Sequence, residues 1–398
     1  MNVASPQAVS SRAFRFVLLV GVMSFFADFV YEGSRSIIGP YLAFLGAGAL
    51  AVGVITGFGE LLGYGLRLVS GRLSDRTRQF WPITIAGYVL QMAVVPLLAL
   101  AGSWQVAALL IVLERVGKAT RNPPRDVMLS HAAKQIGGFG WAFGLHEALD
   151  QFGALVGPLA IAGVLAVRHG GYRLAFVVLA APAAIMLAIL LVARLLYPRP
   201  EEMETNPPDV RTEGLPRVFW IYLGGAALVA MGFADFPLIA FHFHRAGTLS
   251  PTMIPIFYAT AMGVSGLGSL VFGRLFDRVG IGVLVPLTVV SALFAPLVFL
   301  GGFWPALVGV SLWGLGMGVH ESIVPAAVAP MVPMHRRASA YGLFTAGYGV
   351  FWFLGSVAIG GLYGLSRGAV VAFSMACELA AIPFILRVRR QITSARVA

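Results

Sequence analysis

Long apolar runs fill most of the 398-residue chain, and short groups of charged, Gly or Pro residues separate them. A helix needs about 20 apolar residues to cross a bilayer. Because lipid offers the backbone no hydrogen-bond partner, each run is predicted to be a transmembrane helix. The predicted spans are residues 14–43, 48–71, 80–102, 105–124, 138–167, 172–197, 217–244, 252–273, 281–301, 304–331, 338–364 and 367–386.

A polar, Pro-rich segment divides these spans into two sets of six. Residues 198–216 hold five of the 17 acidic residues, so the pattern predicts a cytoplasmic linker. The predicted domains are a six-helix bundle over residues 1–197 and a second over residues 217–398. Residues 1–13 form a short polar lead, and the apolar run after them lacks the cleavage site of a signal peptide.

Composition supports a membrane protein. Hydrophobic residues make up 58% of the chain and charged residues 11%, whereas soluble domains average roughly 25% charged residues. So few charges could not cover a water-facing surface, and the hydrophobicity is too high for a disordered chain. The single cysteine, Cys377, excludes a disulfide framework and a cysteine-based zinc site.

The net charge of +11 would suit a nucleic-acid partner, but the distribution of the basic residues indicates a different cause. Twenty of the 28 Lys and Arg residues lie in segments on one side of the predicted spans, and four lie in the loops on the other side. This is a strong positive-inside bias. We therefore expect a multi-pass protein of the cytoplasmic (inner) membrane with both termini in the cytoplasm, and no nucleic-acid partner.

The two halves of the sequence repeat each other. Ordered matches with a slowly drifting offset predict two six-helix domains related by a parallel repeat, as in transporters that work by alternating access. The matches are Phe-Ala-Asp-Phe at 26–29 and 233–236, a Gly-Arg-Leu-x-Asp-Arg segment at 71–76 and 273–278, and Gly144, Leu145 and Gly157 with Gly342, Leu343 and Gly355.

The second repeated segment carries a conformational motif at the end of spans two and eight. Its glycine is expected to allow close helix approach and to end the span. Its Asp and Arg are expected to form charge pairs that latch the halves at the cytoplasmic surface, although a solvated loop that only sets topology would look the same. The residues are Gly71, Asp75 and Arg76 in the first copy and Gly273, Asp277 and Arg278 in the second.

On these residues the chain resembles the major facilitator superfamily over nearly its whole length, because G-x-L-x-D-R-x-G between helices two and three is that family's signature. The second copy keeps the last glycine as Gly280, whereas the first has Arg78 at that position. The resemblance implies an all-α polytopic membrane protein with twelve transmembrane helices in two pseudo-symmetric six-helix bundles. The text around span four, including Arg121, looks like a poorly characterised prokaryotic branch and implies no substrate.

Span five adds a second motif. Gly144, Gly153, Gly157 and Pro158 match the G-x8-G-x3-G-P pattern of the family's antiporters, so the resemblance implies antiport. Small residues permit tight helix packing, and Pro bends a helix. Simple helix packing is the alternative interpretation of the same residues.

Ten of the 17 acids lie within or at the ends of the predicted spans. An ionised group at the bilayer centre costs about 2.5–3.5 kcal/mol or more, so these acids are candidate functional residues. The resemblance implies a cavity lined by helices one, four, seven and ten. It selects Asp28, Glu32, Arg35, Glu114, Arg115, Lys118, Asp235, His320 and Glu321 as residues of proton coupling or of the substrate cavity.

Helical spacing supports part of this selection. Asp28, Glu32 and Arg35 share one helix face, and Glu114 and Lys118 are four residues apart. A buried acid near a movable cation could couple proton binding to a conformational change. The alternative is a fixed structural ion pair, and Glu378 is interpreted as an interface residue.

The sequence thus predicts a secondary active transporter for a small-molecule substrate. The leading hypothesis is proton-coupled efflux of a small organic solute, and the alternative is proton-coupled uptake of a nutrient or organic anion. Metal transport, suggested by His242 and His244, and a non-transporting membrane sensor are further alternatives. No catalytic set, phosphate-binding loop, bound metal or cofactor is expected, so the chain is not predicted to be an enzyme, and we expect a monomer in the lipid bilayer.

Overall fold

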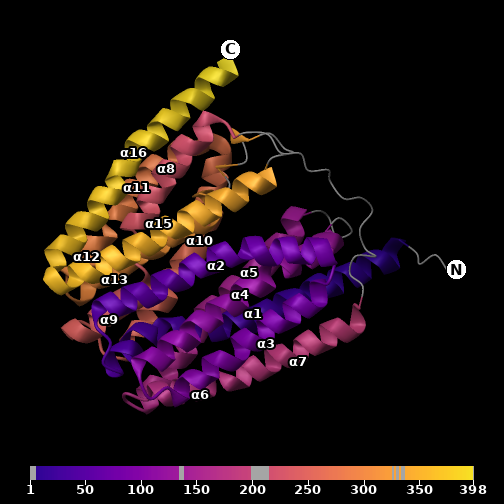
Figure 1. The fold of residues 1–398 in the computed structure, drawn as a ribbon, viewed down its shortest axis with the longest axis horizontal. Coiled ribbons are helices and arrows are strands. Elements are labelled where there is room, and N and C mark those ends of the chain that lie inside the picture. The colour runs from indigo at the N-terminus through magenta and orange to yellow at the C-terminus, as the bar shows by residue number, and fades with distance from the viewer. Residues whose placement is uncertain are drawn as a thin grey trace. The chain divides into compact units, whose positions relative to one another are not determined.

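The computed structural model describes residues 6–133, 139–198, 215–324, 327–328, 331–332 and 337–397, and every regular element in these ranges is helical (Figure 1). Most of the predicted linker, residues 199–214, lies outside the described residues. The first half contains α1 (Pro6–Phe44), α2 (Ala49–Thr77), α3 (Phe80–Leu97), η1 (Leu98–Leu100), α4 (Trp104–Ala133), α5 (Phe139–Val167), α6 (Tyr172–Val178) and α7 (Ala180–Leu196).

The second half is more segmented. Its elements are α8 (Arg217–Gly232), α9 (Phe236–Ala246), α10 (Met253–Val279), η4 (Gly280–Val283), α11 (Leu284–Ala292), α12 (Phe294–Phe299), α13 (Phe303–Gly318), the π-helical η5 (Val319–Ile323), α15 (Arg337–Leu365) and α16 (Arg367–Val397). In Figure 1, α3 runs beside α4 and α16 runs beside α8, and both pairs are in extensive contact.

The predicted fold class is confirmed. Ten helical segments of the described chain are long and apolar enough to cross a membrane, and α4 and α13 complete the twelve predicted spans. These two differ from the other ten for identifiable reasons. Charged residues interrupt the apolar sequence of α4, and α13 has only 16 residues before the π-helical segment begins.

Contacts divide the chain into two compact units. Unit 1 comprises residues 1–35 and 66–207, and unit 2 comprises residues 36–65 and 208–398. The second part of α1 and the first part of α2 therefore pack with the C-terminal residues. Within unit 2, a Cβ on Gly57 would lie 2.7 Å from that of Ser356 on α15, so the glycine permits this close packing. The predicted domain boundary at the linker stays a prediction.

Glycines also bring helices together within unit 1. A Cβ on Gly87 of α3 would lie 2.7 Å from the backbone oxygen of Gly117 on α4, so the two helices approach to backbone contact. Gly153 and Gly157 of α5 pack in the same way against the backbone of Phe25 and Phe29 on α1. Close approach of small residues is the main means of helix association in a membrane.

The repeated Phe-Ala-Asp-Phe segment takes two different conformations. Asp28 lies inside the continuous helix α1, whereas residues 233–235 separate α8 from α9. The sequence difference that accounts for this is Pro237, which stands where the first copy has Val30. Proline lacks the N–H that would continue a helix but is accommodated in a first turn, so the chain breaks and a new helix begins. The span predicted over 217–244 is therefore one apolar stretch, Arg217–Ala246, that is built from two helices.

The conformational motif does not end its helices. α2 continues to Thr77 and α10 to Val279, six residues past each motif glycine. A Cβ on Gly71 would meet only the Pro123 side chain at 3.6 Å, and one on Gly273 would meet nothing within 4 Å among the described residues. The helices thus extend past these glycines, the apolar spans end at Ser74 and Phe276, and the expected close helix approach stays a prediction.

The charged residues of the motif are only partly described. Arg76 and Arg278 are exposed near the ends of α2 and α10. The side chains of Asp75 and Asp277 lie outside the described residues, so the proposed charge latch stays a prediction.

The turn after each motif requires a left-handed residue. Gly280 takes φ = 73°, and Arg78, at the matching position of the first copy, takes φ = 53°. Arg78 is the only non-glycine residue with positive φ among the described residues. A residue with a side chain pays about 1–2 kcal/mol for this conformation, which glycine avoids. The first copy therefore carries local backbone strain that the second copy lacks.

Replacing Arg78 by glycine is expected to stabilise the protein by about 0.5–1 kcal/mol, because relief of the strain exceeds the added freedom of the unfolded chain. Thermal unfolding of the detergent-solubilised protein measures the effect. Arg76→Gly is the matched control, since it removes another exposed arginine but lies inside α2, where glycine costs about 1 kcal/mol. Equal destabilisation by both substitutions would contradict the assignment of strain to Arg78.

Candidate functional site

A cluster of charged residues lies inside unit 1, and α1 provides its first face. Asp28, Tyr31, Glu32 and Arg35 are all buried, with Asp28 only 7% exposed. Their spacing of three or four residues places them on one side of the helix, as predicted from sequence. Charged residues in this setting need partners, because burial removes the water that would solvate them.

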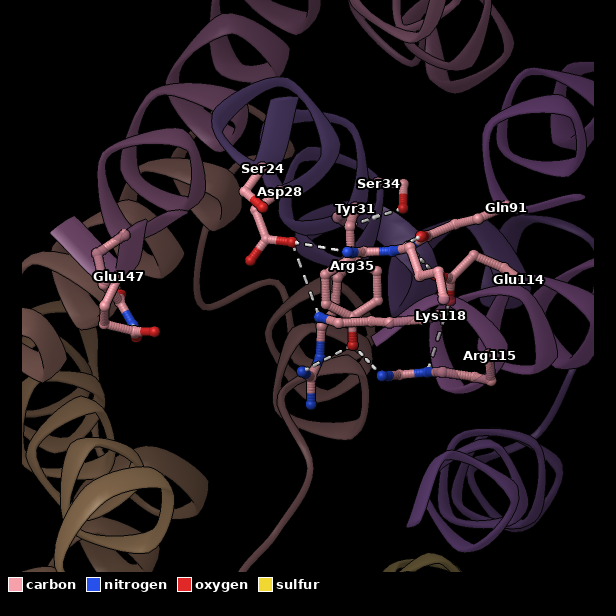
Figure 2. Close-up of polar contacts among 12 residues, drawn as sticks. Ser24, Asp28, Tyr31, Ser34, Arg35, Gln91, Glu114, Arg115, Lys118 and Glu147 are labelled. Atoms are coloured by element: carbon pink, nitrogen blue, oxygen red, sulfur yellow. Dashed lines mark hydrogen bonds and ion pairs between the residues drawn. The ribbon is translucent and has the colours of Figure 1, made fainter. Parts of the chain in front are cut away.

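Helix α4 provides the second face of the cluster. Arg115 donates a hydrogen bond to the Tyr31 hydroxyl, and Arg35 Nη1 donates to the same oxygen at 3.2 Å. The Lys118 ammonium lies over the Tyr31 ring, 3.4 Å from its centre, in a cation–π contact. Figure 2 shows Tyr31 between these three basic side chains. Sequence reasoning selected the three cations but missed the aromatic residue that gathers them.

Asp28 faces two cations at the edge of contact distance. Its Oδ1 lies 3.6 Å from Arg121 Nη2 and 3.9 Å from Lys118 Nζ. These separations exceed those of a charge-assisted hydrogen bond, which is about 2.7–2.9 Å. The acid is therefore held electrostatically by two cations without a short bond to either.

A hydrogen-bonded network from α3 supports the cations from behind. Gln91 donates to Glu114 Oε1 at 2.7 Å and accepts from Arg121 Nε at 2.6 Å. Arg121, only 1% exposed, also donates to the Tyr88 hydroxyl at 3.0 Å. Glu114 in turn lies 3.6 Å from Arg115. Gln91 thus links the two arginines through one amide group.

Gln91 and Tyr88 were not predicted from the sequence. Polar residues in an apolar span are a signal that could have drawn attention to Gln91. Its partners could not have been predicted, because they depend on the approach of α3 to α4 at Gly87 and Gly117.

Helix α5 adds a second acid to the neighbourhood of Asp28. Asp150 interacts electrostatically with Asp28 and with Arg125 of α4. Arg125 donates to the Ser24 hydroxyl at 3.3 Å, and Ser24 is hydrogen-bonded to His146 at 2.7 Å. These contacts join α1, α4 and α5 around two acids that repel each other when both are ionised.

Glu147 lies apart from this cluster. It is exposed on α5, accepts a hydrogen bond from Gln151 at 3.0 Å, and is separated from Tyr31 and its cations in Figure 2. Burial rather than sequence proximity therefore distinguishes the acids of the site.

The sequence-predicted residues of unit 2 do not form a comparable cluster. Asp235 caps the start of α9, where it accepts a hydrogen bond from the Phe236 N–H at 3.1 Å. His320 is buried in the π-helical segment and hydrogen-bonds the Tyr348 hydroxyl at 2.8 Å. Glu321, next to it, is exposed. The structure brings His320 to a cavity, and Glu321 interacts electrostatically with Tyr348, the hydrogen-bond partner of His320.

The remaining predicted residues lie in α5. This helix continues through Pro158, and Gly153 and Gly157 hold it against α1.

His242, considered for metal transport, is hydrogen-bonded to the Tyr363 hydroxyl at 2.9 Å. Among the described residues, no three His, Cys, Asp or Glu side chains lie close enough together to hold a metal ion.

Comparison with known proteins agrees with this architecture. The model of the Major Facilitator Superfamily matches residues 18–356. An uncharacterized protein of Mycobacterium tuberculosis is 45% identical over 383 residues, which cover 95% of this chain and 93% of its own length. An uncharacterized MFS-type transporter of Methanocaldococcus jannaschii is 33% identical over 141 residues, 35% of each chain.

A solved structure shares the fold at low sequence identity. The crystal structure of a bacterial homologue of the human lysosomal transporter Spinster matches with a TM-score of 0.70 and 15% identity, and the match covers 95% of each chain. Fold, motif and family match lead to the same conclusion: the chain belongs to the Major Facilitator Superfamily and is a multi-pass membrane transporter.

Proposed function

We propose that the protein is a proton-coupled secondary transporter that exports a small organic solute by alternating access. The observation that carries the proposal is the position of Asp28, which is buried and lies 3.6 and 3.9 Å from two cations without a short hydrogen bond to either. Protonation of such an acid would remove its attraction to both cations at once. Its charge state then determines how strongly α1 is attracted to α4.

The neighbouring groups give the proton a role in conformational change. Protonation of Asp28 removes the negative charge that faces Arg121 and Lys118, so both cations become available to other partners. Asp150 opposes simultaneous ionisation of the two acids, which favours a state in which one proton is shared in this region. Release of the proton restores the attraction between α1 and α4. The cycle thus converts proton binding into a change in helix–helix interaction.

The exchange of solute for protons is supported by helix α5. The glycines of its antiporter-like pattern, Gly153 and Gly157, pack directly on the α1 backbone next to Asp28. A change in the charge state of Asp28 would therefore act on a helix pair that is in close contact. This packing and the antiporter-like glycine pattern therefore both support efflux of the solute in exchange for protons.

The acids of α1 should be essential for coupling. In proteoliposomes with an imposed pH gradient, addition of substrate should move protons, and Asp28→Asn or Glu32→Gln should reduce this flux by about tenfold or more, equivalent to at least about 1.4 kcal/mol. Glu147→Gln is the matched control, because that acid is exposed. Full proton-coupled flux in both α1 variants would refute the coupling assignment.

A second candidate function is proton-coupled uptake of an organic anion. The cluster supports it because the α1 and α4 faces described above carry four cations, Arg35, Arg115, Lys118 and Arg121, and three acids, Asp28, Glu32 and Glu114. An excess of buried positive charge attracts an anionic ligand, and arginine binds carboxylate and phosphate groups well.

A ligand screen by thermal shift on the purified protein, with small organic anions and cations, separates the two candidates. Anions should raise the unfolding temperature if the cluster binds them. Arg115→Ala should then weaken binding of each such anion by about ten- to a hundredfold, the loss of one charged hydrogen bond. Arg72→Ala, at an exposed position, is the control. Unchanged binding and transport kinetics in Arg115→Ala would assign Arg115 a structural role only.

A further inference from the structure

Unit 2 contains a buried acid that the proposed coupling site does not use. Glu378 on α16 is 0% exposed, and its side chain lies against Gly232 of α8, where a Cβ would be 3.1 Å from the Glu378 Cγ. The next turn of α16 is fixed to the same glycine, because Ser374 donates a hydrogen bond to the Gly232 carbonyl at 2.6 Å. The absence of a side chain at Gly232 leaves room for the carboxyl group inside the unit.

The carboxyl group of Glu378 lacks the partners that an ionised acid requires. Among the described residues, neither of its oxygens has a hydrogen-bond partner. The adjacent hydroxyl is that of Ser291 on α11, whose Oγ also lacks a partner among the described residues. The Ser291 hydroxyl can donate to one carboxyl oxygen at most, so the other has no donor among the described residues.

Among the described residues, no ion pair with a cation is found for the acid either. The helices packed on this part of α16 are α8, α11, α12 and α15. The sequences of α11 and α12 contain no charged residue, and the single arginines of α8 and α15 stand at their first positions. The titratable groups that do face Glu378 are Cys377 on its own helix and Tyr348 on α15. Neither carries a positive charge.

An ionised carboxylate in such a place would be costly. Burial without a hydrogen bond or counter-charge penalises the charged form by several kcal/mol, and a neutral acid avoids most of this cost. The environment of Glu378 therefore favours the protonated form at neutral pH. A proton bound there also lets the carboxyl group donate a hydrogen bond as well as accept one.

A cavity connects this acid with other polar groups. Its lining includes Ser291, Thr288, Tyr222 and His320. Ser291 borders both the cavity and Glu378, while His320 borders the cavity and is hydrogen-bonded to Tyr348. Hydroxyl and imidazole groups around a cavity of this kind can hold water, which can carry protons between them.

We propose that Glu378 is a second proton-binding site, located in unit 2, and that it exchanges its proton through Ser291 and the cavity bordered by His320. This site goes beyond the proposed function, which assigns coupling to the acids of unit 1. Its ligand is a proton held on one carboxyl oxygen. The proton reaches the carboxyl group from water in the cavity and returns by the same path.

Infrared difference spectroscopy of the purified, full-length protein in lipid tests the proposal without a substrate. At neutral pH the wild-type protein should show the carbonyl stretch of a protonated carboxylic acid that is lost in Glu378→Gln. Glu147→Gln, which removes an exposed acid, should retain it. The band should weaken reversibly as the pH rises, and Ser291→Ala should slow its shift on transfer to D₂O. Absence of the band, or a band that never responds to pH, would overturn the proposal.

Spectra recorded in sodium salts distinguish a proton site from a sodium site. A carboxylate and a hydroxyl could also bind Na⁺, so the spectra are compared in sodium and potassium salts at equal ionic strength. Identical bands are expected for a proton site. Loss of the Glu378 band in sodium alone would identify a sodium site and refute the proposal. The infrared band of Glu378 could behave as expected while proton flux in the Asp28 and Glu32 variants is unaffected. That outcome would disprove the coupling assignment in unit 1 and would still support a proton site at Glu378.

The pH dependence of the unfolding temperature provides a further test, because a variant that merely folds poorly would not reproduce it. Gln imitates the neutral acid in shape, so Glu378→Gln should fold and unfold at a similar temperature to wild type at neutral pH. As the pH rises, the unfolded wild-type chain releases a proton that the folded chain retains, so wild type should lose stability relative to the variant. A constant difference between the two across the pH range would contradict the neutral, buried acid.

Discussion

The cost of burying charge in an apolar helix bundle is the constraint on which this structure depends. In unit 1 it is met by bringing polar and charged groups from different helices together, so that Asp28 of α1 faces Arg121 and Lys118 of α4 while Gln91 of α3 donates to Glu114. Pairing of this kind rarely gains much stability, because desolvation offsets the attraction. The effect of the pairing is instead that a change in the charge of one residue alters the electrostatic attraction among several helices. The same property makes the cluster suitable for coupling to protons.

Close helix approach makes these pairs possible. Gly87 and Gly117 allow α3 to reach α4, and this contact brings the Gln91 amide between Glu114 and Arg121. Each small residue acts over one turn of helix, where it removes the side chain that would keep two backbones apart. The hydrogen bonds of the site are therefore a consequence of packing that lies one turn away. In unit 2, Gly232 has the corresponding effect and admits the side chain of Glu378.

Internal repetition of the sequence did not produce identical local structures. One proline at position 237, in place of Val30, turns a continuous helix into two helices with Asp235 at the junction. Two aspartates at equivalent positions thus have different surroundings, an ion-pair cluster for Asp28 and a helix cap for Asp235. Arg78 and Gly280 show the converse, since two different residues at matching positions both take a positive φ. For Asp28 and Asp235 the neighbouring sequence decides the local conformation, whereas for Arg78 and Gly280 the surrounding fold does.

The sequence by itself determined the membrane-spanning class, the twelve helices, the family and the face of α1 that carries Asp28, Glu32 and Arg35, because apolar run length and helical periodicity are local properties. The tertiary structure decided which charges meet. Tyr31 gathers three cations, Gln91 joins Glu114 to Arg121, and Glu378 is left without a cation, none of which follows from spacing along one helix. Such contacts depend on the rotation and separation of helices far apart in the chain. Those are set by packing over whole helix faces, which single-helix patterns do not encode.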